Sequence, residues 1–167
     1  MDVANILDPS SVRCEPQVSS KKHALDLLSQ LLGHAGNVPA GEIADGLASR
    51  ERLGSTGLGA SVAMPHTKMA GIEHNVGAFL RLARAVDFDS PDGEPVDLLF
   101  GLLVPEGSTA GELQEIRELV KRLRDPELQR QLRASDNPQA LYGVLTDKLN
   151  SRQAAHRGPS VRRPTGS

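Results

Sequence analysis

The chain has 167 residues, enough for one domain with some length left for tails. Apolar residues make up 38% of it, so it can bury a hydrophobic core and global disorder is disfavoured. Aromatic residues make up only 2%, which disfavours nucleic-acid or carbohydrate binding by ring stacking. The net charge of −2 gives no general attraction to polyanions, and we expect no nucleic-acid partner.

The single cysteine and the hydropathy pattern indicate a reducing compartment. Cys14 has no second cysteine with which to form an intramolecular disulfide. No apolar stretch has the length of a membrane span or the layout of a signal peptide. We therefore expect a cytoplasmic protein without membrane insertion. No basic or redox motif adjoins Cys14 in the sequence, which favours a half-buried cysteine over a reactive thiol.

Two helices are predicted in the first third of the chain. The first covers residues 20–33, with Ser20 as a candidate N-cap. The second begins at Pro39, a suitable first-turn residue, and its apolar stripe ends near Gly54. The apolar positions that recur at helical spacing are Leu25, Leu28, Leu31, Leu32, Ile43, Ala44, Leu47 and Ala48.

Strands and further helices follow. Residues 76–82 are typical of a strand, and residues 96–104 form a nearly continuous apolar run that predicts a central strand covered on both faces. Thr109 and Glu112 have the spacing of a capping box at the start of an amphipathic helix. Asx-Pro pairs at 125–126 and 137–138 open two shorter helices.

The apolar periodicity stops after residue 149. We therefore predict a folded domain over residues 1–149 and a flexible basic tail over residues 150–167. The tail contains arginines among Gly, Pro and Ser but no aromatic residue, which favours a solvated tail over a functional basic arm.

A glycine-rich segment is the first candidate for function. Gly54, Gly57 and Gly59 surround the hydroxyls of Ser55 and Thr56. Glycines let backbone N–H groups approach a ligand closely, and such turns form anion-binding concavities. No Lys-Ser or Lys-Thr pair follows, so a nucleotide-binding P-loop is weakly supported. Phosphate is the expected ligand, and the alternative is a plain turn.

His66 lies a few residues beyond this segment and is the candidate phosphoryl acceptor. A neutral imidazole is nucleophilic near neutral pH, and the phosphoramidate that it forms stays reactive. Pro65 has a fixed φ and biases Met64 toward an extended conformation, which predicts a ring held at a strand end. A Pro-His pair alone is usually structural, but the neighbouring anion loop favours a functional role.

The other histidines give no metal signal. His23, His34 and His74 have no metal-ligand spacing with a nearby cysteine or carboxylate motif. We predict no metal and no other cofactor.

Two separated stretches carry a family resemblance. Residues 50–59 and 63–66 resemble the active-site region of the fructose/mannitol-type enzyme IIA family of the bacterial phosphotransferase system. Residues 95–100 and 102–105 resemble the family's central strand and the loop that follows it. The likeness covers residues 5–149 and is greatest to the stand-alone subgroup of the nitrogen-related branch. It implies a single α/β domain with a mixed central β-sheet flanked by helices.

The resemblance also implies roles for individual residues. His66 would be the phosphorylated residue. Arg50 would hold phosphate, because its planar fork can donate two hydrogen bonds to phosphate oxygens. Ser55, Thr56 and Gly57 would supply hydroxyl or backbone donors. Without the resemblance, Arg50 is more simply interpreted as a surface charge of a helix.

The sequence departs from the family pattern at two positions. Glu112 stands where the family usually has a second active-site histidine. Its carboxylate could orient the His66 ring or repel a phosphoryl group on it, but the favoured role is the capping box with Thr109. Thr67 stands where the family more often has a small residue, and we expect it to be tolerated.

The implied activity is that of a phosphotransferase with a phosphohistidine intermediate. An HPr-like phosphocarrier would transfer a phosphoryl group to His66 by in-line attack, in a pathway of nitrogen or metabolic regulation with unidentified target proteins. One alternative is a sugar-specific IIA component that passes phosphate to a IIB protein. Another is a regulatory binding module with weak or lost transfer.

Overall fold

The structure is a computed structural model that describes residues 2–149. The tail predicted for residues 150–167 lies outside the described residues. The helices are η1 (Val3–Asn5), α1 (Lys21–Gly36), α2 (Ala40–Arg52), α3 (Ala110–Leu123), α4 (Pro126–Ala134) and α5 (Pro138–Leu149). The strands are β1 (Leu7–Cys14), β2 (Gly57–Gly59), β3 (Val62–Ala63), β4 (His66–Met69), β5 (Val76–Val86) and β6 (Val96–Pro105). Within the described residues, no helix has the length and apolar character needed to cross a membrane.

The strands form one mixed sheet, in the order β1-β5-β6-β3-β2. β5 pairs antiparallel with β6 and parallel with β1. On its other edge β6 pairs in parallel with two short strands in succession, β3 at Leu98 and Leu99 and β4 from Leu102 to Pro105. β6 is therefore central, as predicted, and the mixed α/β fold is confirmed.

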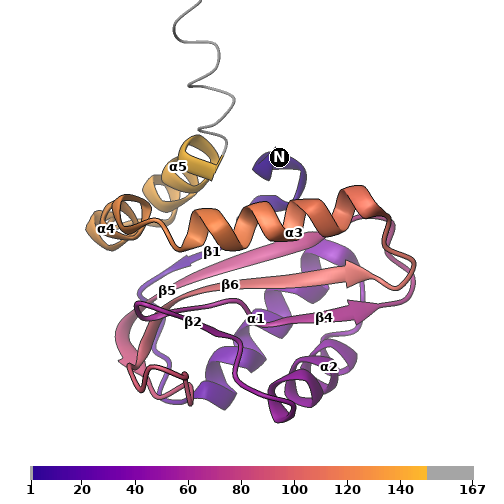
Figure 1. The fold of residues 1–167 in the computed structure, drawn as a ribbon, viewed down its shortest axis with the longest axis horizontal. Helices are drawn as coiled ribbons and strands as arrows, with labels where there is room; N and C mark the ends of the chain where they lie inside the picture. The colour runs from indigo at the N-terminus through magenta and orange to yellow at the C-terminus, as the bar shows by residue number, and fades with distance from the viewer. Residues whose placement is uncertain (1, 150–167) are drawn as a thin grey trace, which may run out of the picture.

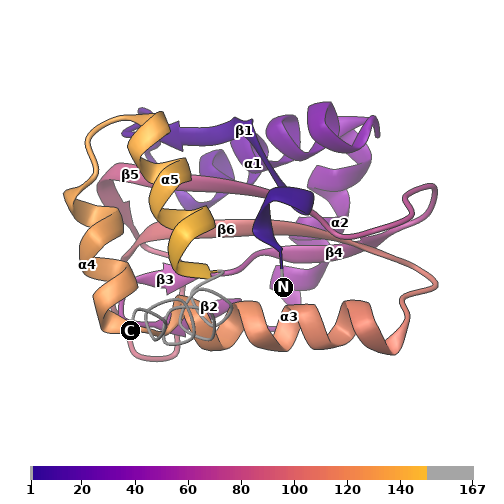
Figure 2. The ribbon, with the colours of Figure 1, turned by 90° about the horizontal axis from the view of Figure 1, so that it is seen from above.

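Helices cover both faces of the sheet. Figure 1 shows α1 and α2 on one side, with α3, α4 and α5 on the other. Figure 2 shows α5 over β1 and α3 along the opposite edge, beside β3 and β4. Successive side chains of β6 enter different cores: Leu99 and Leu103 pack with α1 and α2, whereas Leu98 and Leu102 pack with α3, α4 and α5. This alternation explains why β6 is apolar at nearly every position.

The predicted N-termini of the helices agree closely with the structure. The Ser20 hydroxyl accepts the N–H of His23 at the start of α1, and Pro39 is the N-cap of α2 rather than a first-turn residue. α1 continues three residues past its predicted end, to Gly36, and stops where Asn37 adopts a left-handed conformation with φ of 54°. Gly33 allows a close approach of the chain after α1, because a Cβ there would lie 2.7 Å from the carbonyl oxygen of Val38.

The C-terminal helices begin where their caps predicted. Thr109 and Glu112 form the predicted capping box of α3. The Asp125 side chain accepts the N–H of Glu127 at the start of α4, and Asn137 accepts the N–H of Ala140 at the start of α5.

Candidate functional site

His66 is the first residue of β4 and lies partly buried beside the centre of the sheet. It is in register with Leu102 of β6, whose N–H donates to the carbonyl oxygen of Pro65 at 2.9 Å. The next residue, Thr67, packs against Gly46 of α2. Because successive strand side chains point to opposite faces, the His66 ring lies on the face that α3 covers. The histidine is therefore held at a strand end, as Pro65 predicted.

One ring nitrogen of His66 is engaged by the backbone. Nδ1 lies 2.9 Å from the carbonyl oxygen of Met64. A carbonyl oxygen can only accept, so the bond places the imidazole proton on Nδ1. In the neutral ring, Nε2 then carries the lone pair and is the nucleophilic atom.

A series of hydrogen bonds holds Met64, whose carbonyl oxygen binds the His66 ring. The N–H of Met64 donates to the carbonyl oxygen of Thr56 at 3.0 Å. The N–H of Thr56 donates to Glu51 Oε1 at 3.2 Å, and its hydroxyl donates to Glu51 Oε2. Glu51 in turn lies 2.9 Å from Lys21 Nζ and has a side chain only 6% exposed. Hydrogen bonds and covalent connections thus link a largely buried ion pair to the histidine ring.

Sequence reasoning assigned no role to Glu51. It lies between two arginines at the end of a helix, where a charged residue is usually a solvated surface group. Its contact with Thr56 spans five residues across the end of α2, so helical periodicity gives no signal for it. The remaining signal was its place inside the stretch that resembles the family's active-site region.

The hydroxyls of the glycine-rich segment are engaged within the protein. Ser55 Oγ donates to the carbonyl oxygen of Phe88 at 2.9 Å and accepts the N–H of Gly57 at 3.0 Å. The Thr56 hydroxyl is bound to Glu51, and Thr56 is 5% exposed. A phosphate held by these donors would have to replace the bonds seen here. Their role as phosphate ligands stays a prediction.

Arg50 lies in the last turn of α2 and reaches into the same segment. Its Nη1 donates to the carbonyl oxygen of Gly54 at 2.8 Å. Within the described residues, its other guanidinium N–H groups make no hydrogen bond. The side chain is thus anchored at one nitrogen, while the other donors are available to an anion.

Glu112 is held by the helix cap. Its carboxylate accepts the Thr109 N–H at 2.8 Å, and its own N–H donates to Thr109 Oγ1 at 3.2 Å. It lines a hollow together with His74, Asn75 and Glu115, which His66 does not line. In the described part of the chain no hydrogen bond joins Glu112 to His66, so the structure supports the capping role.

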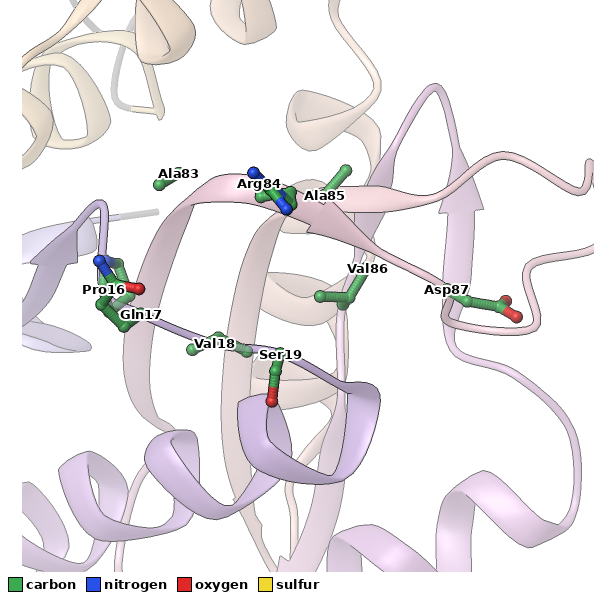
Figure 3. Close-up of a pocket in the computed structure, with 9 residues that line it drawn as sticks. All are labelled: Pro16, Gln17, Val18, Ser19, Ala83, Arg84, Ala85, Val86 and Asp87. Carbon is green, nitrogen blue, oxygen red and sulfur yellow. The ribbon is translucent and has the colours of Figure 1, made fainter.

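A separate groove lies away from these residues. Figure 3 shows it between residues 16–19, which lead into α1, and residues 83–87 at the end of β5. Arg84 and Asp87 are its charged lining residues. Neither His66 nor the glycine-rich segment contributes to this groove, so it is not part of the candidate site.

The possible metal ligands and Cys14 are the other polar residues that the sequence analysis considered. Within residues 2–149, no cluster of three or more His, Cys, Asp or Glu side chains could hold a metal ion. Cys14 is partly buried, in agreement with the sequence analysis. Arg81, which is distant in sequence, places Nη1 3.7 Å from its sulfur, but the same nitrogen also binds the Ser135 carbonyl oxygen and Glu15.

The fold and the site together describe a single-domain α/β protein that presents a partly buried imidazole at the start of a strand beside a glycine-rich segment. The sequence model of the family described as "Phosphoenolpyruvate-dependent sugar phosphotransferase system, EIIA 2" matches residues 5–148, and the chain belongs to this family.

Its relatives include nitrogen regulatory proteins. One from Bradyrhizobium diazoefficiens is 39% identical over 145 residues, which cover 87% of this chain and 95% of the relative. One from Escherichia coli K12 is 35% identical over 148 residues, which cover 88% of this chain and 91% of the relative. The crystal structure of nitrogen regulatory protein IIA-Ntr from Neisseria meningitidis matches with a TM-score of 0.80 at 35% identity, over 86% of this chain and 99% of that one. The resemblance to the nitrogen-related subgroup is confirmed.

Proposed function

We propose that this protein is a cytoplasmic phosphocarrier that accepts a phosphoryl group on Nε2 of His66 from an HPr-like phosphocarrier and acts in nitrogen-related metabolic regulation. The observation that carries the proposal is the hydrogen bond from His66 Nδ1 to the Met64 carbonyl oxygen, because it leaves Nε2 as the nucleophile. Membership of the EIIA 2 family and likeness to nitrogen regulatory proteins support the regulatory role.

The transfer is a displacement at phosphorus. The Nε2 lone pair of His66 forms the new P–N bond while the P–N bond of the donor phosphohistidine breaks, and its electron pair stays on the donor imidazole. The His66 ring gains positive character in this step. The Met64 carbonyl oxygen accepts a hydrogen bond from the Nδ1–H group, and its dipole stabilises that charge without any prior movement of the ring.

Arg50 would bind the phosphoryl oxygens in this proposal. Its guanidinium is fixed at Nη1 by Gly54 and keeps further N–H groups for an anion. Ser55, Thr56 and Gly57 would contribute donors only after exchanging their present partners. We therefore rank Arg50 above the glycine-rich segment as the source of charge stabilisation.

Labelling by a phosphorylated carrier tests the proposal. Wild type, His66→Ala and the control His34→Ala are incubated with an HPr-like protein that has been phosphorylated by its own enzyme I. His34 is a suitable control because it is exposed on α1. We expect stoichiometric, acid-labile and base-stable label on wild type and His34→Ala, and none on His66→Ala. Equal labelling of His66→Ala would exclude His66 as the acceptor.

A second step of the same experiment separates the regulatory role from sugar transport. Phosphorylated protein is mixed with a fructose- or mannitol-type IIB protein. Retention of the label after mixing favours regulation, whereas rapid loss to IIB favours a sugar-specific component.

A further inference from the structure

The carboxylate of Glu51 is almost completely buried close to the candidate site, and the proposed phosphoryl transfer assigns it no role. Its side chain is 6% exposed and lies 2.9 Å from Lys21 Nζ. Burial of an ion pair seldom stabilises a fold, because the cost of desolvation offsets the attraction between the charges. A charged pair kept in this position therefore calls for another explanation.

The contacts of Glu51 lead to the histidine in three steps. Both carboxylate oxygens bind Thr56, one at the N–H with a distance of 3.2 Å and the other at the hydroxyl. These contacts hold Thr56 at its N–H and its side chain, and its carbonyl oxygen accepts the Met64 N–H at 3.0 Å. The Met64 carbonyl oxygen then accepts a hydrogen bond from His66 Nδ1, at a distance of 2.9 Å.

The Lys21–Glu51 pair, from which these contacts start, is also tied to the connection between β5 and β6. Lys21, the first residue of α1, also donates to the carbonyl oxygen of Phe88 at 3.2 Å, and its ammonium lies 4.7 Å from the centre of the Phe88 ring. Ser55 Oγ donates to the same carbonyl oxygen. The start of α1, the end of α2 and the connection from β5 to β6 thus meet around the Lys21–Glu51 pair, which limits movement of the neighbouring Thr56.

We infer that Glu51 is a positioning residue for His66: by fixing the backbone and side chain of Thr56 it aims the Met64 carbonyl oxygen at Nδ1 and thereby selects the tautomer in which Nε2 is nucleophilic. The catalytic consequence rests on the proposed function. The tautomer itself is a property of the resting protein and can be measured without any phosphoryl transfer.

The test is the ¹⁵N NMR spectrum of the imidazole rings at alkaline pH, where they are neutral, together with the kinetics of transfer from the carrier. Glu51→Ala removes both contacts with Thr56. Glu51→Gln keeps them, since an amide can accept from the N–H and donate to the hydroxyl oxygen. Asp26→Asn is the matched control, because it breaks another 2.9 Å ion pair of α1, Lys22–Asp26, which does not contact Thr56.

We expect the Nδ1–H tautomer of His66 to dominate in wild type, Glu51→Gln and Asp26→Asn. In Glu51→Ala we expect both tautomers, with a transfer kcat lower by up to about 10²-fold, the scale of a misplaced reacting group, and an unchanged KM for the carrier. If Glu51→Ala does not fold, Lys21→Met/Glu51→Ala replaces it, because that variant does not leave the Lys21 ammonium without its 2.9 Å partner.

Three results would overturn the inference. The first is an Nε2–H tautomer in the wild-type protein, which needs no variant to detect. The second is a folded Glu51→Ala protein with wild-type tautomer and transfer rate. The third is equal disturbance in Asp26→Asn, which would show that any lost ion pair has this effect. Failure of the carrier to label any protein would instead contradict the proposed function, while the tautomer measurement would still decide the role of Glu51.

Discussion

Gly46 of α2 faces Thr67 of β4 so closely that a Cβ on the glycine would lie 2.6 Å from Thr67 Oγ1 and 3.1 Å from Thr67 Cγ2. The absence of a side chain at Gly46 therefore gives room for the larger residue that this sequence has after His66. Because β4 carries His66 as its first residue, this contact also holds the strand that positions the ring.

The substitution Gly46→Ala should destabilise the protein when Thr67 is present and stabilise it when Thr67 is replaced by glycine. With Thr67 present, the added methyl overpacks the contact at a typical cost of about 1–3 kcal/mol, which outweighs the helix propensity of Ala. In a Thr67→Gly background the contact is absent, and the propensity gain of about 1 kcal/mol should stabilise the protein. Urea unfolding of the four proteins of this double-mutant cycle measures both effects. An equal effect of Gly46→Ala in both backgrounds would disprove the coupling.

Arg50→Ala should slow phosphoryl transfer without unfolding the protein. Its guanidinium makes one hydrogen bond, to the carbonyl oxygen of Gly54 just beyond α2, and we assign its other donors to phosphate. Removing one preorganised donor costs on the order of 10²-fold in rate. Arg52→Ala is the control, since Arg52 is exposed and its hydrogen bond goes to Ser49 of the same helix. Equal transfer rates for the two variants, with similar melting temperatures, would return Arg50 to a surface role.

Glu112 offers a test of capping against site electrostatics. As half of the capping box, its loss in Glu112→Ala should cost about 0.5–1 kcal/mol of stability, while Glu112→Gln should cost less because the amide can still accept the Thr109 N–H. We expect the lifetime of phosphorylated His66 to be the same in wild type and Glu112→Gln. A longer lifetime in Glu112→Gln, or a further change in Glu112→His, would show that the charge acts on the phosphoryl group.

The connection between β2 and β3 holds two strained residues just before the segment that leads to His66. Ala60 and Ser61 have φ of 55° and 65°, and the Ala60 carbonyl oxygen is fixed by Arg133 Nη2 at 3.0 Å. An L-residue in this region costs about 1–2 kcal/mol that glycine avoids, partly offset by the greater freedom of glycine in the unfolded chain. Ser61→Gly should therefore stabilise the protein by about 0.5–1 kcal/mol.

Ala35→Gly is the control for this prediction. Ala35 lies on the exposed face of α1, and its replacement by glycine should destabilise the protein by about 1 kcal/mol. Destabilisation by both substitutions in chemical unfolding would contradict the strain at Ser61.

The elements predicted best from the sequence are those marked by an uninterrupted apolar run or by capping residues close together in the chain. β6 was recognisable because both its faces are buried and its apolar run is uninterrupted. The caps of α3, α4 and α5 are local hydrogen bonds whose spacing can be read directly. His66 could be proposed as the acceptor because a reactive side chain, a proline and a glycine-rich segment of the kind that binds anions lie close together in sequence.

The missed elements depend on irregular pairing or distant contacts. β1 carries Asp8, Pro9, Ser10 and Ser11 directly after its first residue, and its pairing with β5 shifts register between Leu7 and Val12, so its sequence has no regular apolar alternation. The strands β2, β3 and β4 have two to four residues each, too few for a periodic pattern. The role that we infer for Glu51 involves its ion pair with Lys21, which lies thirty residues earlier in the chain, and nothing in the sequence near Lys21 indicates this contact.

The most direct test of the account is to identify the ring nitrogen that carries the phosphoryl group. The protein is labelled with ¹⁵N at its histidine rings, phosphorylated by the HPr-like carrier and studied by ¹⁵N and ³¹P NMR under alkaline conditions. Because Nδ1 is bound to the Met64 carbonyl oxygen, we expect phosphorus–nitrogen coupling at Nε2 of His66 alone. Phosphorus on Nδ1 of His66, or on any other residue, would contradict the account.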